Sequence, residues 1–257
     1  MSIAVFRHAG AGAFRPLVLL HPLGVDHTFW AALVDDIADR DVVTLDLPGH
    51  GVSPTPASAV SLDVLARSVG SALRSAGLIE VDLVGVSLGG LIAQHLSAQD
   101  DIVVAHLVLV DTVISYPSVV RKQWRSRALT ARTDGMRSLV DPTMQTWFSA
   151  GYLADPDARL SQLIEVFSTG DPEGYALNCC ALAEANTVGL LATLDVPTLV
   201  ACGVDDLAHF REEAERLARA VAYAQLVWLP GRHAAAFESA TEFASVLKEF
   251  LMKEAAA

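Results

Sequence analysis

The sequence predicts an α/β fold, with a mostly parallel central sheet flanked by helices and a helical segment inserted late in the chain. Short apolar runs bounded by turn residues recur along it, and amphipathic stretches of helical period separate them. One long stretch of helical composition contains no convincing strand. Because parallel neighbouring strands need a crossover connection, this alternation favours a parallel sheet with helices on its faces.

Six apolar runs are typical of strands buried on both faces: Pro16–Leu20, Asp41–Leu45, Val81–Val86, His106–Val110, Thr198–Cys202 and Gln225–Leu229. Helical periodicity predicts helices over Trp30–Asp39, Leu62–Ser75, Leu88–Ala98 and Arg211–Ala220, and a closing helix over Ala240–Lys253. Strands from both the N-terminal and the C-terminal part of the chain are thus expected to form the sheet.

The stretch without strands predicts a helical cap over residues 113–191, inserted in a core made of residues 1–112 and 192–257. Proline disfavours helical geometry in the residue before it, so several short helices are expected there. The dividing prolines are Pro117, Pro142, Pro156 and Pro172.

Composition narrows the classes of partner. The chain has 257 residues, 52% of them hydrophobic, and a formal net charge of −12, which argues against binding nucleic acid or an anionic membrane. We therefore expect a small-molecule partner, and the oligomeric state stays open. The first residues do not form a charged start followed by a long apolar stretch, so we expect no signal peptide. No segment has about 18 uninterrupted apolar residues, and the three cysteines are expected to be reduced thiols, so the protein is expected to be soluble and cytoplasmic.

A G-x-S-x-G pentad, Gly85 to Gly89, joins the run Val81–Val86 to the helix predicted from Leu88. Such a strand-to-helix turn raises a serine into an exposed and strained position, and small neighbours prevent backbone clashes. Ser87 is therefore the candidate nucleophile. The N–H of Leu88 is the first candidate donor to an oxyanion, at the positive end of the helix dipole.

A serine nucleophile needs a base and an acid that orients the base. His233 follows Gln225–Leu229 and a Pro-Gly turn, so it is expected at the carboxyl edge of the sheet, where Ser87 emerges. Asp205 and Asp206 follow Thr198–Cys202 at the same edge, and from position alone either could be the acid. His209 is a minor rival base.

Five of the remaining histidines are expected to be structural. His95 lies eight residues along the helix from Ser87, about 12 Å of axial rise, so it is too distant to take the serine proton. His8 and His106 have no acidic or turn context in the sequence. His21 and His50 lie in turns, and we expect His21 to form hydrogen bonds within its loop and His50 to be structural.

Two further segments carry a family resemblance. His21-Pro22-Leu23-Gly24 resembles an H-G-x-G oxyanion loop, and Asp46 to Ser53 resembles the D-x-P-G-x-G-x-S segment of the α/β-hydrolase superfamily. Together with the pentad, they identify the chain as resembling that superfamily over residues 17 to 250. The resemblance implies the α/β-hydrolase fold, the N–H of Leu23 as second oxyanion donor, and Asp206, three residues after a glycine, as the acid.

Within the superfamily, segments of the insertion resemble 3-oxoadipate enol-lactonases. They include Trp124 to Arg127, Trp147-Phe148 and Asp171 to Tyr175. This resemblance implies Trp124, Arg127 and Trp147 as substrate-binding residues and a carboxylated enol-lactone from aromatic catabolism as substrate. The chain departs from those enzymes at His21-Pro22, after Asp206 and around His233, so its pocket chemistry can differ.

We therefore expect a serine hydrolase that cleaves a small carboxylic ester or lactone through an acyl-enzyme, with no cofactor and no metal. Two alternatives share the scaffold. One is a C–C bond hydrolase acting on aromatic ring-cleavage products, and the other is a ligand receptor with little turnover.

Overall fold

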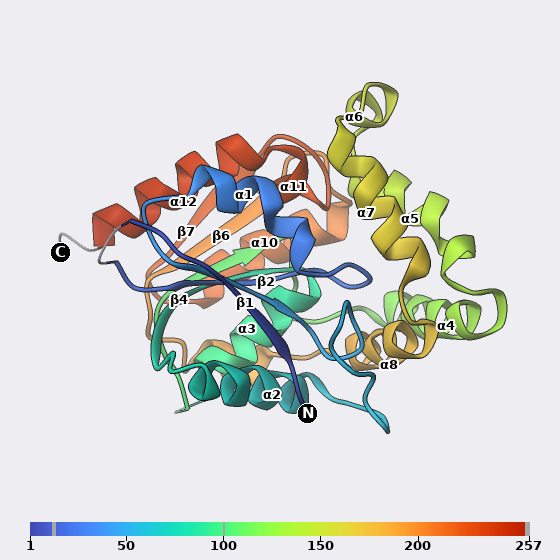
Figure 1. The fold of residues 1–257 in the computed structure, drawn as a ribbon, viewed down its shortest axis with the longest axis horizontal. Helices are drawn as coiled ribbons and strands as arrows, with labels where there is room; N and C mark the ends of the chain where they lie inside the picture. The colour runs from blue at the N-terminus through green and yellow to red at the C-terminus, as the bar shows by residue number, and fades with distance from the viewer. Residues whose placement is uncertain (12–13, 100, 255–257) are drawn as a thin grey trace.

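The computed structural model describes residues 1–11, 14–99 and 101–254. In these ranges, seven strands form one sheet in the order β1-β3-β2-β4-β5-β6-β7 (Figure 1). The strands are β1 Ala4–His8, β2 Leu17–Leu20, β3 Val42–Asp46, β4 Glu80–Val86, β5 Val103–Val110, β6 Thr198–Gly203 and β7 Ala224–Leu229. Strand β1 pairs antiparallel with β3, and the other pairings are parallel. The predicted mostly parallel sheet is confirmed.

All six predicted strands are present, with ends that differ by up to three residues. The sequence prediction missed β1, whose residues are half-buried or exposed, because an edge strand of this kind does not form an apolar run. It also placed His106 at the start of a strand, whereas β5 begins at Val103. The first residues of β5 are exposed or only partly buried, so they do not belong to the buried apolar run from which the strand was predicted.

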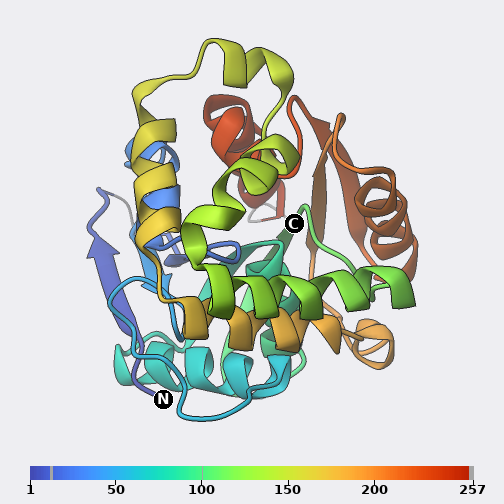
Figure 2. The same ribbon diagram turned by 90° about the vertical axis from the view of Figure 1, so that its right-hand side faces the viewer.

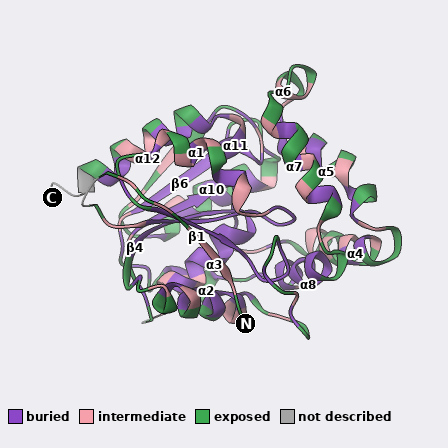
Figure 3. Ribbon diagram, viewed as in Figure 1, coloured by how far each residue is buried: buried purple, intermediate pink, exposed green. Residues whose placement is uncertain are grey.

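Helices cover both faces of the sheet. Figure 1 shows α1 (Ala31–Asp36), α11 (Ala235–Glu238) and α12 (Ala240–Glu254) on one side of the sheet, and α2 (Leu62–Ser75) and α3 (Leu88–Ser97) on the other. A further helix, α10 (Ala208–Ala220), packs on β6 and β7. Buried residues line the inner sides of these helices and make up most of the strands from β2 to β6 (Figure 3).

The predicted helix over Trp30–Asp39 is two elements. A 3-10 helix spans His27–Trp30 and continues into the short α1, and the Asp26 side chain caps the first turn by accepting from the Thr28 N–H. The helix therefore begins earlier than predicted, because the capping aspartate lies four residues before the expected start.

Helices alone occupy the segment between β5 and β6. We call them the cap helices: α4 Ser118–Asp134, a 3-10 turn Met136–Leu139, α5 Val140–Trp147, α6 Ala150–Ala154, α7 Ala158–Thr169, α8 Pro172–Ala183 and α9 Val188–Leu191. Helices α4 to α8 gather beyond one end of the sheet, and α4 packs along α8, whereas α9 contacts α3 (Figures 1 and 2). Pro172 begins α8, as expected of a dividing proline, but Pro142 lies in the first turn of α5, where its missing N–H is not needed.

Two other sequence expectations bear on the described residues. None of their helices combines the length and the apolar character needed to cross a membrane. Cys179, Cys180 and Cys202 are all free thiols, the first and last of them buried.

Candidate active site

Ser87 lies on the tight turn between β4 and α3. Its backbone has φ 53° and ψ −109°, a conformation that costs energy for any residue other than glycine. Two hydrogen bonds hold the turn: the Ser87 N–H donates to Val110 O at 2.9 Å, and the Thr112 hydroxyl donates to Ser87 O at 2.8 Å. The surrounding strands thus maintain a strained turn that presents the serine.

Glycines make this turn possible. A Cβ at Gly85 would lie 2.3 Å from Gly89 O, and a Cβ at Gly89 would lie 2.3 Å from Leu20 O. Both distances are far below any real contact. The pentad therefore needs glycine at its first and last positions because backbone from the turn and from β2 fills the space of a side chain.

The three residues expected to form a catalytic triad meet in one chain of hydrogen bonds. His233 Nε2 lies 3.0 Å from Ser87 Oγ, and His233 Nδ1 lies 2.9 Å from Asp206 Oδ2. All three residues are buried, while Asp205 is exposed. Of the two aspartates that position alone left open, Asp206 is the one that contacts the imidazole, and its second oxygen accepts the Leu207 N–H at 2.6 Å.

The environment of His233 favours its charged form. Burial disfavours the imidazolium, but the charge of Asp206 and its hydrogen bond to the ring outweigh that effect and raise the pKa of His233 above 6.5. Asp206 also fixes the tautomer, since Nδ1 must carry the proton that it donates to the carboxylate. Nε2 of the neutral ring is then left as an acceptor facing Ser87.

Asp111, which the sequence analysis did not single out, lies behind the triad at the end of β5. Its backbone has φ 46°, and its carboxyl group accepts the N–H of Gly203 at 2.8 Å and of Ala235 at 3.3 Å. These bonds tie the loops that carry Asp206 and His233 to β5. Burial, together with the nearby Asp206 carboxylate, raises the pKa of Asp111. An acidic residue directly after an apolar strand was the only signal in the sequence.

One expected oxyanion donor lies at the start of α3, directly after Ser87, and the other lies on the loop after β2. Leu88 is the first residue of α3, so its N–H has no partner within the helix, and Leu23 lines the same cavity as Ser87. His21 braces the Leu23 loop: Nε2 accepts the Leu47 N–H at 2.9 Å, so Nδ1 carries the proton and donates to Pro22 O at 2.7 Å. Burial lowers the pKa of His21 to about 4, so the ring stays neutral.

Other histidines lie outside the triad. His106 Nδ1 lies 2.6 Å from Asp82 on the neighbouring strand, so it has an acidic partner that the sequence did not reveal, and His8 Nε2 lies 3.2 Å from the Thr44 hydroxyl. His95 is on α3 at the end away from Ser87. His209 borders the cavity, but His233 is the histidine that contacts Ser87.

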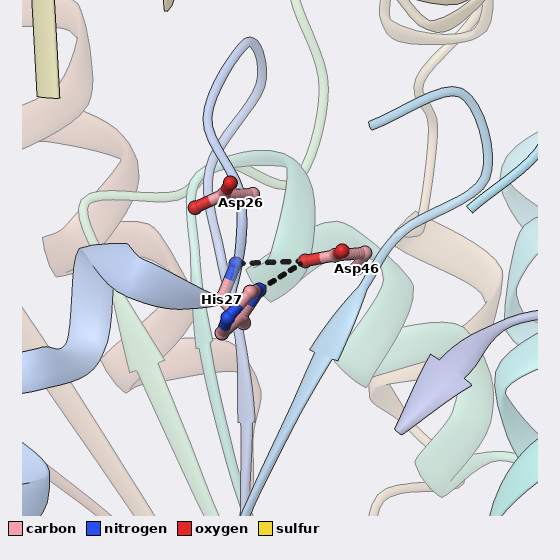
Figure 4. Close-up of side chains that lie close together, drawn as sticks. All are labelled: Asp26, His27 and Asp46. Atoms are coloured by element: carbon pink, nitrogen blue, oxygen red, sulfur yellow. Dashed lines mark hydrogen bonds and ion pairs between the residues drawn. The ribbon is translucent and has the colours of Figure 1, made fainter. Parts of the chain in front are cut away.

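Two clusters of described residues have the spacing of metal ligands: Asp26-His27-Asp46, and Asp111-Cys202-Asp206. Figure 4 shows the first, in which Asp46 lies against His27. The Asp46 carboxylate accepts the His27 N–H at 2.9 Å, the His27 ring N–H at 2.8 Å and the Val52 N–H at 2.8 Å. Since three donors already satisfy it, Asp46 joins two loops rather than offering free oxygen ligands.

A cavity of about 310 Å³ opens above Ser87, and Trp124, Arg127 and Trp147 all line it together with His233. The cap helices α4 and α5 supply these three side chains. The structure therefore brings the expected substrate-binding residues to the same cavity as the triad. The cavity lies between the core loops and the cap helices, where ligand sites are common.

Arg127 is the one arginine that lines the cavity, and it has no acidic partner among the described residues. It donates to the Tyr175 hydroxyl at 2.8 Å and to the Thr143 hydroxyl, both on the cavity wall. Arg125 and Arg132, on the same helix, pair with Glu184 and Glu173 and are solvated. One unneutralised cation thus borders the cavity.

Comparison with known proteins agrees with this geometry. A model of the alpha/beta hydrolase family matches residues 17–246. The chain belongs to the alpha/beta hydrolase family. The predicted family and fold are thereby confirmed, and the protein is a hydrolase.

Individual relatives span nearly the whole hydrolase. A 3-oxoadipate enol-lactonase from Acinetobacter baylyi is 27% identical over 246 residues, 93% of this chain and 91% of its own. A pimeloyl-[acyl-carrier protein] methyl ester esterase from Chromobacterium violaceum is 30% identical, over 93% and 95% of the two chains. The crystal structure of the enol-lactonase from Burkholderia xenovorans superimposes with a TM-score of 0.92 at 30% identity, covering 97% of this chain and 96% of that one.

Proposed function

We propose that this hydrolase cleaves a small carboxylic ester or lactone through an acyl-enzyme, with Ser87 as nucleophile, His233 as base and Asp206 as the acid. The observation that supports the proposal is the continuous hydrogen-bond chain from Ser87 Oγ through His233 to Asp206, located at a cavity. Three segments distant in sequence supply these residues.

The chemistry follows from the tautomer of His233. As Ser87 Oγ attacks the substrate carbonyl carbon, Nε2 takes its proton and Asp206 stabilises the imidazolium. The bond to the leaving oxygen then breaks and Nε2 returns the proton to that oxygen, which stays attached to the acyl chain if the substrate is a lactone. Water, deprotonated by the same nitrogen, attacks the acyl-enzyme, and the acid and free Ser87 are released.

Charge develops on the carbonyl oxygen during both attacks. We propose the N–H groups of Leu23 and Leu88 as its donors, because Leu88 begins α3 directly after Ser87 and Leu23 lines the same cavity as Ser87. Such donors act strongly in a site that excludes water, and removing one typically costs about 10²–10³-fold in turnover.

The cap is proposed to select a substrate with a carboxylate. Arg127 supports this, because a cation without an acidic partner in a small cavity favours an anionic ligand. Trp124 and Trp147 would contact the apolar part of the substrate. The relatives named as enol-lactonases favour a carboxylated enol-lactone as the first compound to test.

The test compares hydrolysis of a carboxylated enol-lactone, a neutral lactone and neutral aryl esters. Ser87→Ala is expected to lower kcat/KM for every substrate by several orders of magnitude, about 10⁶-fold where the triad acts as a unit. Arg127→Gln is expected to raise KM for the carboxylated lactone and leave the neutral substrates unchanged.

Each variant has a matched control. Ser97→Ala removes another buried serine hydroxyl from the same helix, and Arg125→Gln removes a solvated arginine from α4; both should behave as wild type. Full activity in Ser87→Ala would reject the mechanism. Hydrolysis only of neutral esters would reject the carboxylated substrate, and no hydrolysis with any substrate would favour C–C cleavage or a receptor.

A further inference from the structure

An aromatic ring packs against the imidazole of His233. The centroid of the Phe210 ring lies 4.0 Å from that of His233, with an angle of 40° between the two ring planes. Phe210 is only 4% exposed, and it lines the cavity that contains Ser87, as His233 does. The two rings are thus in direct contact at the site of the proposed proton transfer.

Hydrogen bonds occupy the edges of the imidazole and leave its faces to other contacts. Nδ1 faces Asp206 Oδ2 at 2.9 Å, and Nε2 faces Ser87 Oγ at 3.0 Å. Both ring nitrogens are therefore used, and Phe210 adds a contact of a different kind. An apolar neighbour of this size also keeps water away from the ring.

Other rings hold Phe210 in place. The His209 ring centroid lies 4.1 Å from that of Phe210, and the Tyr116 ring meets it edge-on at 6.4 Å. Phe210 lies in the first turn of α10, four residues after Asp206. The segment that carries the proposed acid thus also carries the ring, and it is one of the places where the chain departs from the enol-lactonases.

The proposed reaction gives His233 a charge for which an aromatic neighbour matters. When Nε2 takes the proton of Ser87, the imidazole becomes a cation. A cation within about 6 Å of the centre of an aromatic ring is attracted by the π electrons, and more strongly where both groups are withdrawn from water. His233 and Phe210 are both buried, so the contact meets these conditions.

We propose that Phe210 is a positioning residue, which holds the His233 imidazole in place for Ser87 and stabilises its charged form through the π electrons of the ring. This inference rests on the proposed function and deepens it. Asp206 would stabilise the imidazolium through an edge of the imidazole, and Phe210 would do so from beside its plane. An aliphatic side chain in place of Phe210 would still exclude water but would not attract the charge.

A change that weakens the π electrons and keeps the ring tests the proposal. Such a change is 3,4,5-trifluorophenylalanine at position 210, introduced by suppression of an amber codon. In the Ser87→Ala variant, where no turnover is needed, the midpoint of the His233 NMR titration is expected to move about 0.5–1 pH unit lower. Phe210→Leu should move it in the same direction, and the His233 signal is identified by its absence in His233→Gln.

Ester hydrolysis by the enzyme with Ser87 intact gives a second readout. The inflection in the pH profile of kcat/KM should move to lower pH with the trifluorinated ring, as the NMR midpoint does. Above the inflection, kcat should fall by about 2–10-fold, because the imidazolium of the transition state loses the same stabilisation.

The charged and titratable groups around His233 are the same with either ring. They are Asp206 after β6, Asp111 after β5, Arg232 on the same loop, His209 on α10 and Ser87 before α3. Burial lowers the pKa of His209, whereas the pKa of His233 is raised by Asp206, so His209 loses its proton first as the pH rises. A shift between the two rings therefore reports the contact with Phe210.

Phe250→Leu is the matched control. Phe250 on α12 is buried and packs against another histidine, His106, at 5.8 Å between centroids, and it does not line the cavity. The His233 midpoint and the inflection of kcat/KM should both stay at their wild-type values in this variant.

The outcomes separate this proposal from the proposed function. If the trifluorinated ring leaves the midpoint and the inflection unchanged, the proposal is overturned whatever Phe210→Leu does, because Phe210 then acts by packing alone. An equal shift in Phe250→Leu would also overturn it, since the effect would not belong to this contact. A lower NMR midpoint without any Ser87-dependent hydrolysis would overturn the hydrolytic function and leave the stabilising contact standing.

Discussion

His233 can accept the proton of Ser87 only while its ring is neutral. Its pKa therefore sets the lower pH limit of the proposed reaction. Burial alone would lower this pKa, but Asp206 raises it above 6.5, so neutral ring becomes scarce already at mildly acidic pH. The same interaction that orients the base thus narrows the pH range in which it works.

The pH profile of kcat/KM tests this reasoning. We expect activity to rise with pH through an inflection above 6.5, as the raised pKa of His233 requires. Asp206→Asn removes the charge that stabilises the imidazolium, so the inflection should move to lower pH, and turnover should fall by about 10⁴-fold because the tautomer is no longer fixed.

Asp205→Asn is the matched control, because Asp205 is the exposed neighbour and does not contact the ring. Its profile should overlay that of the wild type. An inflection below 6.5 in the wild type, or an equal shift in both variants, would contradict the role assigned to Asp206.

Ser87 and His233 could be predicted because each has a local sequence pattern around it. Ser87 lies in a glycine pentad, and His233 follows a strand and a turn. The sequence could not decide between Asp205 and Asp206 from position, since the side chain that turns inward depends on the path of the loop. It missed Asp111 and the contact of His106 with Asp82 for a related reason. Those partners lie on neighbouring strands, and a local sequence pattern does not show how two strands align with one another.

At the scale of elements, the turn between β4 and α3 depends on close backbone packing. Gly89→Ala would place a Cβ 2.3 Å from Leu20 O, and the contacting atoms are all backbone, which cannot move aside as a flexible side chain could. We expect a loss of about 1–3 kcal/mol in the free energy of unfolding, typical of overpacking, and a further loss of turnover because Ser87 and the Leu88 N–H would move.

Chemical denaturation together with ester hydrolysis measures both effects. Gly189→Ala is the control, since it adds a methyl group to the short helix α9, where a Cβ meets nothing within 4 Å. That variant should be as stable as the wild type or more so by about 0.4–1 kcal/mol. Equal stability of the two variants would show that the turn can adapt.

The elements themselves were predicted well where burial is complete and poorly where it is partial. Strands buried on both faces stand out as apolar runs, and α2 was predicted with its observed bounds. The edge strand β1 gave no such run. Proline was also an incomplete guide, because its effect depends on position within a turn, and Pro142 lies where a helix tolerates it.

Over the whole molecule, the proposed chemistry and the buried ion pair of Arg40 with Asp82 occupy opposite ends of the sheet. Ser87 directly follows the last residue of β4. Asp82 lies on β4 five residues before Ser87, a distance of roughly 16 Å along the strand. Asp82 contacts Arg40 at 2.6 Å and His106 at 2.6 Å, and all three residues are buried. This cluster joins β4 and β5 to the segment before β3.

Asp82→Asn should therefore affect stability and not catalysis. It leaves the Arg40 charge buried without its partner, a change that typically costs about 3–5 kcal/mol in the free energy of unfolding. Glu80→Gln, two residues away on the same strand, breaks only the exposed pair with Arg15 and should cost less than about 1 kcal/mol. Denaturation curves measure the loss, and kcat/KM of the folded fraction should match the wild type in both variants. A stable Asp82→Asn protein, or one that is folded but inactive, would show that the two ends of the sheet are not independent.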